Sequence, residues 1–187
     1  MLNQLRPALV LTAAMTIVTG LAYPFAMTGI AGTLMPAQAK GSLIEKEGKV
    51  IGSTLIGQNF ASDRYFWPRP SATSPDPYSA NASSGSNLGT TSAKLRDRVA
   101  ADVAKLKTAG SPASVPGDAV TTSGSGLDPH ISPDYARMQI ARVAGARGIT
   151  PSAVQELLTR QTEGRDLGFV GEPRVNVLQL NMALDSL

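Results

Sequence analysis

The stretch PALVLTAAMTIVTGLAYPFAMTGIAGTLMPAQA, residues 7–39, contains no Asp, Glu, Lys, Arg or His, and most of its side chains are aliphatic or small. A helix crosses the hydrocarbon core of a bilayer with about 20 apolar residues. The stretch therefore predicts one membrane-spanning anchor helix over residues 7–35, preceded by a short cytoplasmic tail, residues 1–6. A single soluble domain, residues 36–187, is expected to follow on one face of the membrane.

A cleaved signal peptide is the alternative to a retained anchor. Arg6 supplies the basic start of a signal peptide, and Ala-Gln-Ala at residues 37–39 resembles the small-residue motif before a cleavage site. The apolar region of a signal peptide is about 7–15 residues long. The region here continues from residue 8 to about residue 35, so we favour the retained anchor.

The charges beside the span give conflicting indications of its orientation. Arg6 lies on the short side, whereas Lys40, Lys46 and Lys49 lie on the long side, mixed with two glutamates. Counted literally, the positive-inside rule places the C-terminal domain in the cytoplasm. Long domains translocate largely regardless of charge, however, and a short basic tail is typical of an N-terminal anchor. We favour a periplasmic domain.

The composition of the chain excludes several kinds of site. There is no Cys and one His, which rules out thiol catalysis, thiolate metal sites and multi-histidine metal sites. The net charge is +3, but basic residues are interspersed with acidic ones and form no stripe with aromatic residues, so nucleic acid is not an expected partner. No G-x-x-x-x-G-K-S/T phosphate loop occurs. We predict no metal site and no nucleotide hydrolysis by this chain alone.

The pattern of apolar residues predicts a helix-rich α+β domain. The β-branched run at residues 49–57 predicts a strand or hairpin, and residues 68–91, rich in Ser, Asn, Gly and Pro, predict a long loop. Apolar residues three or four apart predict a helix from Leu95 to Leu106, which Ala109-Gly110-Ser111-Pro112 ends. Ser132 and Thr150, each followed by a proline, are typical N-caps. Further helices are expected over residues 133–147 and from residue 151. The apolar segment 175–184 is ambiguous between strand and helix, and we favour a short helix from residue 177.

Aromatic residues just before the long loop and polar residues within it are candidates for contact with a partner. Tyr65-Phe66-Trp67 is either part of the domain core or an interface anchor, and the core is favoured. Arg69 lies between two prolines in an extended segment, where it either contacts a partner or is solvated. Ser84 and Asn87 belong to a Ser/Gly/Asn run, residues 83–87, that could hold a phosphate or a partner backbone, although such runs form turns more often.

The densest polar segment is TTSGSGLDPHIS, residues 121–132. Ser123, Ser125, Asp128 and His130 in one loop suggest a serine hydrolase, but the G-x-S-x-G nucleophile elbow is absent and residues so close in a loop seldom form a triad. The alternative is that Asp128 and the serines make turn and cap hydrogen bonds. Glycines in the loop also permit backbone N–H groups to face an anion. We favour turns and caps and predict no catalytic residue.

Seven short runs, taken in order with the anchor, resemble the C subunits of the bacterial Kdp potassium-transporting P-type ATPase. They extend over essentially the whole chain, and each is weak alone while their order is specific. The runs are GSLI (41–44), LIGQNF (55–60), YFWPRPS (65–71), SSGSNL (83–88), VPGD (115–118), SGSGLDPHIS (123–132) and GEPRVNVL (171–178).

The resemblance implies an accessory, non-enzymatic subunit of a bacterial inner-membrane pump. Its implied partners are a channel-like potassium-selective subunit, a P-type ATPase subunit and a small single-span subunit. The family is described as a catalytic chaperone, needed for assembly, that raises the affinity of the ATPase subunit for ATP. Gln58 then matches the glutamine proposed to contact nucleotide, with no cofactor bound stably and ATP met through the complex. Under this resemblance the candidates for partner contact are Arg69, Ser84, Asn87, Ser123, Ser125, Asp128, His130 and, in the last run, Arg174.

Three hypotheses follow from the sequence. The favoured one is a subunit whose loops clamp the extracytoplasmic side of the channel subunit. The second is a modulator of ATP affinity acting through Gln58. The third is a membrane-anchored serine hydrolase that uses the loop of residues 123–132.

Overall fold

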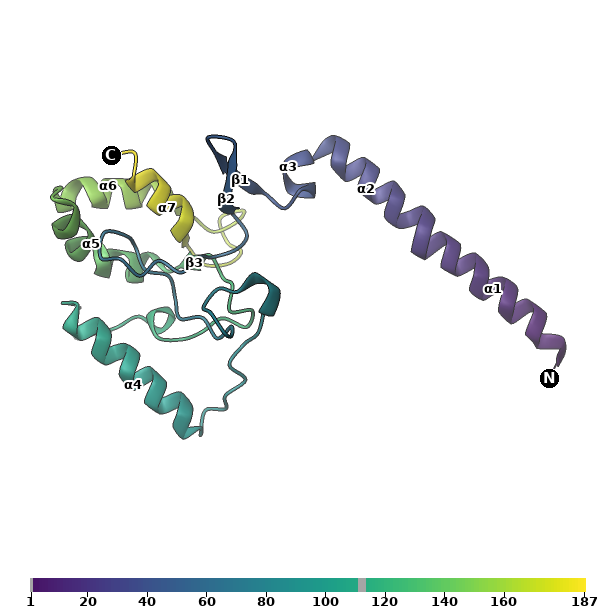
Figure 1. Ribbon diagram of the computed structural model, residues 1–187, viewed down its shortest axis with the longest axis horizontal. Helices are drawn as coiled ribbons and strands as arrows, with labels where there is room; N and C mark the ends of the chain where they lie inside the picture. Colours follow the sequence, from purple (N-terminus) through teal and green to yellow (C-terminus); the bar gives the residue numbers. More distant parts are fainter. Residues whose placement is uncertain (1, 111–113) are drawn as a thin grey trace. The chain divides into compact units, whose positions relative to one another are not determined.

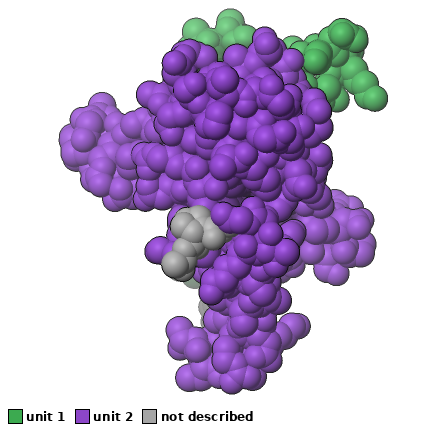
Figure 2. All heavy atoms as spheres, turned by 90° about the vertical axis from the view of Figure 1, so that its left-hand side faces the viewer, with its two compact units in different colours: residues 1–51 green, residues 52–187 purple. Residues whose placement is uncertain are grey.

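The computed structural model describes residues 2–110 and 114–187 (Figure 1). Met1 of the predicted tail, and Ser111 and Pro112 of the predicted helix end, lie outside the described residues. The chain divides into two compact units, Met1–Ile51 and Gly52–Leu187, which are coloured separately in Figure 2.

The first unit is dominated by one apolar helix. A short 3-10 turn, Leu2–Gln4, leads into α1 (Leu5–Ile17), the π-helical segment η2 (Val18–Ala22) and α2 (Tyr23–Leu34). Together α1, η2 and α2 form 30 continuous helical residues, and their most apolar 18-residue stretch has a mean hydropathy of 1.7 and is not buried. The predicted N-terminal apolar helix is confirmed, and it is long and apolar enough to cross a membrane.

The wide π-helical turn comes directly before Pro24. Proline lacks an N–H group, and its ring clashes with the carbonyl four residues earlier, here that of Gly20. A π-helical turn inside an α-helix widens the backbone locally. Thr19 and Thr33 donate their hydroxyls to the carbonyls of Met15 and Gly29, at 2.6 and 2.8 Å. The helix therefore passes the proline without ending.

A β-hairpin follows the short helix α3 (Pro36–Ala39). Strand β1 (Leu43–Lys46) pairs with β2 (Lys49–Ser53), so the predicted region, residues 49–57, contains one strand, and its partner strand precedes that region. The connecting residues Glu47 and Gly48 both have positive φ angles, of 53° and 74°. Two such residues give the tight turn whose twist suits a hairpin.

The second unit contains the predicted helices. Ser92, Ser132, Thr150 and Asn176 each accept a hydrogen bond from a backbone N–H of the first turn, so each of these helices begins at a side-chain cap. Gly148 closes α5 in the left-handed conformation, φ 70°. The elements are η3 (Ala80–Ala82), α4 (Ala93–Thr108), η4 (Gly117–Ala119), β3 (His130–Ile131), α5 (Pro133–Arg147), α6 (Pro151–Gln161), β4 (Thr162–Glu163), β5 (Arg174–Asn176) and α7 (Val177–Leu184).

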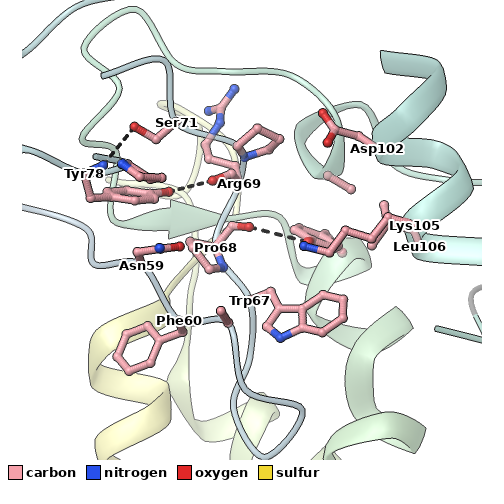
Figure 3. A pocket seen from close by; sticks show the side chains of 15 residues that line it. Asn59, Phe60, Trp67, Pro68, Arg69, Ser71, Tyr78, Asp102, Lys105 and Leu106 are labelled. Atoms are coloured by element: carbon pink, nitrogen blue, oxygen red, sulfur yellow. Dashed lines mark hydrogen bonds between the residues drawn. The ribbon is translucent and has the colours of Figure 1, made fainter. Parts of the chain in front are cut away.

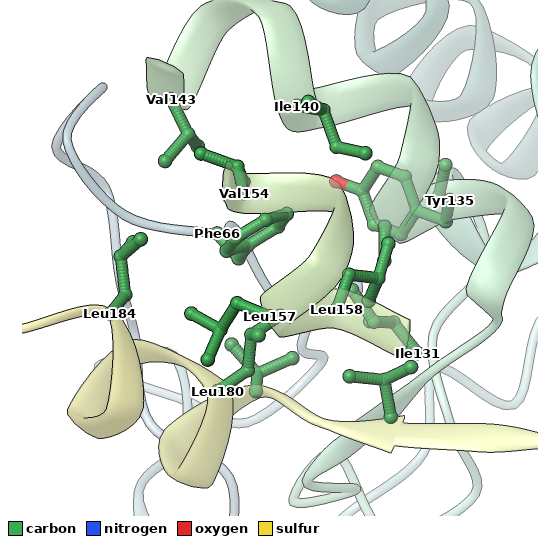
Figure 4. Packing of buried hydrophobic residues seen from close by; sticks show 14 of the residues in the cluster. Phe66, Ile131, Tyr135, Ile140, Val143, Val154, Leu157, Leu158, Leu180 and Leu184 are labelled. Atoms are coloured by element: carbon green, nitrogen blue, oxygen red, sulfur yellow. The ribbon is translucent and has the colours of Figure 1, made fainter. Parts of the chain in front are cut away.

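A small antiparallel sheet and three helices enclose the core. The strand order is β3-β5-β4, with His130 opposite Asn176 and Glu163 opposite Arg174. Helix α6 packs against both α5 and α7, and all three contact β5. Figure 4 shows Phe66, from the segment just before the long loop, among side chains of these helices, and its ring is fully buried. The fold is α+β and helix-rich, as predicted.

Candidate functional site

Two buried amide side chains hold the aromatic segment in place. Asn181 of α7 accepts from the Phe66 backbone N–H at 2.8 Å and donates to the Phe66 carbonyl at 3.0 Å. Gln139 of α5 does the same for Trp67, at 2.7 and 3.1 Å. Each amide thus satisfies one residue of extended backbone as a neighbouring strand would. Phe66 belongs to the core as predicted. We call these hydrogen bonds from Asn181 and Gln139 to the backbone of Phe66 and Trp67 the clasp, and they fix where the following loop begins.

The Trp67 ring is close to two cations. The Arg142 guanidinium is 3.7 Å from the ring centroid and the Lys105 ammonium is 5.1 Å from it. Arg142 also donates to the Asp63 and Tyr65 carbonyls, at 2.7 and 3.1 Å. Burial lowers the pKa of Arg142, but an arginine remains charged at any physiological pH. The cation contacts orient the half-buried indole at the base of the loop.

Arg69 joins the two predicted loops. Its guanidinium forms an ion pair with the Asp128 carboxylate at 2.8 Å and donates to the Thr121 carbonyl at 3.2 Å. Both charged side chains are partly buried. Pro68 and Pro70 flank Arg69, and the ring of each proline holds its own φ angle near −65°. Arg69 therefore reaches the second loop from a stiff, extended segment. The structure places Arg69 inside a contact between two loops of the chain itself.

Asp128 is the centre of this contact. Its carboxylate also accepts from the His130 backbone N–H at 2.9 Å, and the His130 ring Nδ1 lies 3.5 Å away. Burial acts to raise the pKa of Asp128, but hydrogen bonds from His130 and Arg69 outweigh it and hold the pKa below its usual range. The Asp128 carboxylate is therefore ionised, and its oxygens are engaged by Arg69 and His130.

Tyr78 locks the first loop from inside. Its hydroxyl donates to the Arg69 carbonyl at 2.7 Å, and its backbone N–H donates to Ser71 Oγ at 3.0 Å. Tyr78 has a φ of 61°, a strained conformation for a bulky side chain. A Cβ on Gly57 would lie 2.5 Å from the Tyr78 ring, so glycine is required there. Burial, followed by the charge of Asp128, raises the pKa of Tyr78.

Backbone contacts bind the serine-rich segments together. The Ser84 N–H donates to the Ser125 carbonyl at 2.9 Å, and Ser71 Oγ donates to the Gly126 carbonyl at 2.7 Å. A Cβ on Gly85 would come within 2.9 Å of the Gly124 oxygen. Gly126, with a φ of 69°, would bring a Cβ within 2.8 Å of the Ser84 oxygen. We call residues 68–87 and 121–130, which these contacts unite, the loop junction.

The two predicted serines shape their own loop. Ser123 Oγ accepts from the Gly126 N–H at 2.8 Å, and Ser125 Oγ accepts from the Leu127 N–H at 3.1 Å. Neither hydroxyl is hydrogen-bonded to His130 in the part of the chain that the structure describes. These are the turn contacts that we favoured over a catalytic triad, and they give the hydrolase hypothesis no support.

Three predicted residues lie apart from these contacts. Arg174 of β5 pairs with Glu163 and Asp166, at 2.8 and 3.2 Å. Asn87 is exposed, with a φ of 50°. Gln58 lies beside the hairpin strand, where its Nε2 would be 2.5 Å from a Cβ on Gly52.

A pocket of about 180 Å³ opens beside the loop junction. Figure 3 shows Tyr78, Arg69 and Trp67 along one side and Asp102, Lys105 and Leu106 of α4 along the other. Asp102 Oδ2 is buried without a hydrogen-bond partner among the described residues, and burial raises the pKa of Asp102. The pocket combines aromatic and proline side chains with the charged side chains of Arg69, Asp102 and Lys105.

Several residues that organise the site escaped the sequence reasoning. Tyr78, Gln139 and Asn181 have the contacts given above, and Asp118 accepts from both the N–H and the hydroxyl of Ser132, at 2.7 and 2.9 Å. Gln139 and Asn181 occupy apolar faces of their helices, and a polar residue on such a face is a usable signal of a buried hydrogen bond. Nothing in the local pattern distinguishes Tyr78.

Comparison with known proteins shows the family of the chain. The family described as K+-transporting ATPase, c chain, matches residues 5–186. The potassium-transporting ATPase KdpC subunit of Bradyrhizobium diazoefficiens is 59% identical over 196 residues, covering 99% of this chain and 98% of its own. Those of Methylobacterium nodulans and Rhodopseudomonas palustris strain BisB5 are 56% and 57% identical, each covering 100% of this chain and 98% of their own. The chain therefore belongs to the KdpC family, the c-chain subunits of potassium-transporting ATPases.

Proposed function

We propose that this chain is the accessory, non-catalytic subunit of a high-affinity, ATP-driven potassium uptake pump of the bacterial inner membrane, and that it is required for assembly and activity. Its proposed partners are the channel-like potassium-selective subunit, the P-type ATPase subunit and a small single-span subunit. The anchor crosses the bilayer once, and the larger unit lies in the periplasm.

The observation that carries the proposal is the way the loop junction uses its polar groups. Arg69, Asp128 and Tyr78 bind one another or backbone atoms, as do the serines of residues 123–125. A catalytic site keeps reactive groups accessible to substrate, whereas a docking surface requires a fixed shape before binding. We infer that the loop junction contacts the channel-like subunit.

A role in ATP affinity belongs to the same proposal. We propose that no cofactor binds this chain stably and that it raises the affinity of the ATPase subunit for ATP by holding the assembled complex. The side chains of Gln58 and Leu178 both lie close to Gly52. The packed position of Gln58 supports an indirect effect over direct contact with nucleotide.

A bulky substitution on the loop junction tests the docking role. The Ser84 side chain is exposed and its backbone N–H makes the contact with Ser125, so Ser84→Trp adds volume without removing that bond. We expect about ten-fold less channel-like subunit to co-purify with the chain from detergent-solubilised membranes, equivalent to about 1.4 kcal/mol.

Ser152→Trp is the matched control, because Ser152 is equally a solvent-facing serine but lies on α6. It should leave co-purification unchanged. Full retention of the channel-like subunit by Ser84→Trp would contradict docking through the loop junction.

A further inference from the structure

A tight, exposed hairpin projects between β4 and β5. The backbone groups of Asp166 and Val170 exchange two hydrogen bonds of 2.9 Å. Leu167 and Gly168 at its turn have φ angles of 55° and 83°. The chain therefore reverses over three residues, Leu167 to Phe169, in a fixed backbone conformation.

The tip of this hairpin is apolar and in contact with water. The exposed fractions are 86% for Leu167, 73% for Phe169 and 47% for Val170. Isolated apolar side chains are normal on protein surfaces, but several gathered at one projecting tip indicate a contact with another molecule. Each such side chain gains favourable free energy when it is removed from water.

Ion pairs brace the base of the hairpin. Arg165 pairs with Glu172 at 2.7 Å, and Arg174 pairs with Glu163 at 2.8 Å and with Asp166 at 3.2 Å. Exposed pairs add little stability individually, but one arginine shared by two carboxylates restricts both. A tip held in one conformation loses little entropy on binding.

The charges at the base favour a protein over a lipid surface. Between Thr162 and Asn176, a stretch described throughout, three carboxylates face two guanidiniums, and both guanidiniums are paired. Insertion into a bilayer is strengthened by unpaired Lys or Arg, which anionic headgroups attract. The base of this hairpin, between Thr162 and Asn176, offers no free cation to such headgroups.

We propose that Leu167 and Phe169 form an anchor that inserts into an apolar pocket on another protein subunit of the same pump. The inference rests on the proposed function, because it requires that the chain assembles with other subunits. It adds a second contact, separate from the loop junction, and gives a role to Arg174, which the loop junction does not use.

Site-specific photo-crosslinking tests the anchor in the assembled pump. p-Benzoylphenylalanine in place of Phe169 keeps an aromatic side chain at the tip, and irradiation of membranes containing the full complex should join it to another pump subunit, identified by mass spectrometry. The same probe at Leu187, which is 61% exposed, is the control and should give no such adduct. Adducts with lipid alone, or with a second copy of this chain, would overturn the proposal.

A serine double variant tests the energetic contribution of the tip. Leu167→Ser with Phe169→Ser should lower retention of the partner subunits about ten-fold for each side chain that acts as a hot spot. Because both side chains are exposed, the melting temperature of the chain should not fall. Leu187→Ser should match the unsubstituted protein in both measurements.

The two proposals fail in different ways. If the unsubstituted chain does not co-purify with pump subunits, the proposed function is wrong. If the unsubstituted chain co-purifies and the double variant does so equally well, only the anchor is wrong.

Discussion

At the scale of single residues, side chains that look reactive in the sequence act as braces in the fold. Asp128 is held by Arg69 and His130, and Ser123 and Ser125 accept bonds from backbone N–H groups. Such residues shape the loop junction, which we propose as the docking surface. Their substitution should therefore alter assembly before it alters any chemical step.

Gln58 provides a prediction at this scale. Because its side chain packs beside Gly52, Gln58→Ala should leave the apparent KM of the purified pump for ATP unchanged. Steady-state ATPase rates over a range of ATP concentrations measure this, with Gln155→Ala on α6 as a control of the same residue type. A raised apparent KM in the Gln58 variant alone would instead assign nucleotide contact to this residue.

At the scale of secondary-structure elements, the clasp of Phe66 links a loop to α7. Asn181→Leu keeps a similar side-chain volume but leaves the buried N–H and C=O of Phe66 without their partner. Each unpaired buried group costs about 1–3 kcal/mol. We expect a loss of at least about 2 kcal/mol of unfolding free energy, measured by urea denaturation of the full chain in detergent.

The control for this variant is Asn59→Leu, at an exposed asparagine, which should change the unfolding free energy by no more than about 0.5 kcal/mol. Equal stability of the Asn181 variant would mean that the clasp contributes nothing.

Elements with local signals were predictable, and contacts between loops were not. The helices beginning after Ser132 and Thr150 follow from a cap, a proline and an apolar face. The anchor helix follows from hydropathy alone. The loop junction depends instead on bonds such as Ser71 to Gly126, between residues far apart in the chain. No periodic pattern encodes such pairs, so the sequence identified Arg69 and Asp128 as candidates without showing that they meet.

At the scale of the whole molecule, orientation decides which partners the larger unit can reach. We expect the C-terminus in the periplasm, because the proposed function has the loop junction contact the extracytoplasmic side of the channel-like subunit. Alkaline phosphatase fused after Leu187 should be active in intact cells, whereas green fluorescent protein fused at the same point should not fluoresce. The opposite pair of signals would place the larger unit in the cytoplasm and contradict the proposed docking.

The indole of Trp67, close to two cations, has a practical consequence. It is the sole tryptophan among the 187 residues, and it stands between the buried Phe66 and the proline-braced Arg69. Its intrinsic fluorescence is therefore a label-free optical gauge of this one region in the purified chain. Emission wavelength and quenching by iodide would report whether the loops have kept their native arrangement, separately from the far-ultraviolet signal of the helices.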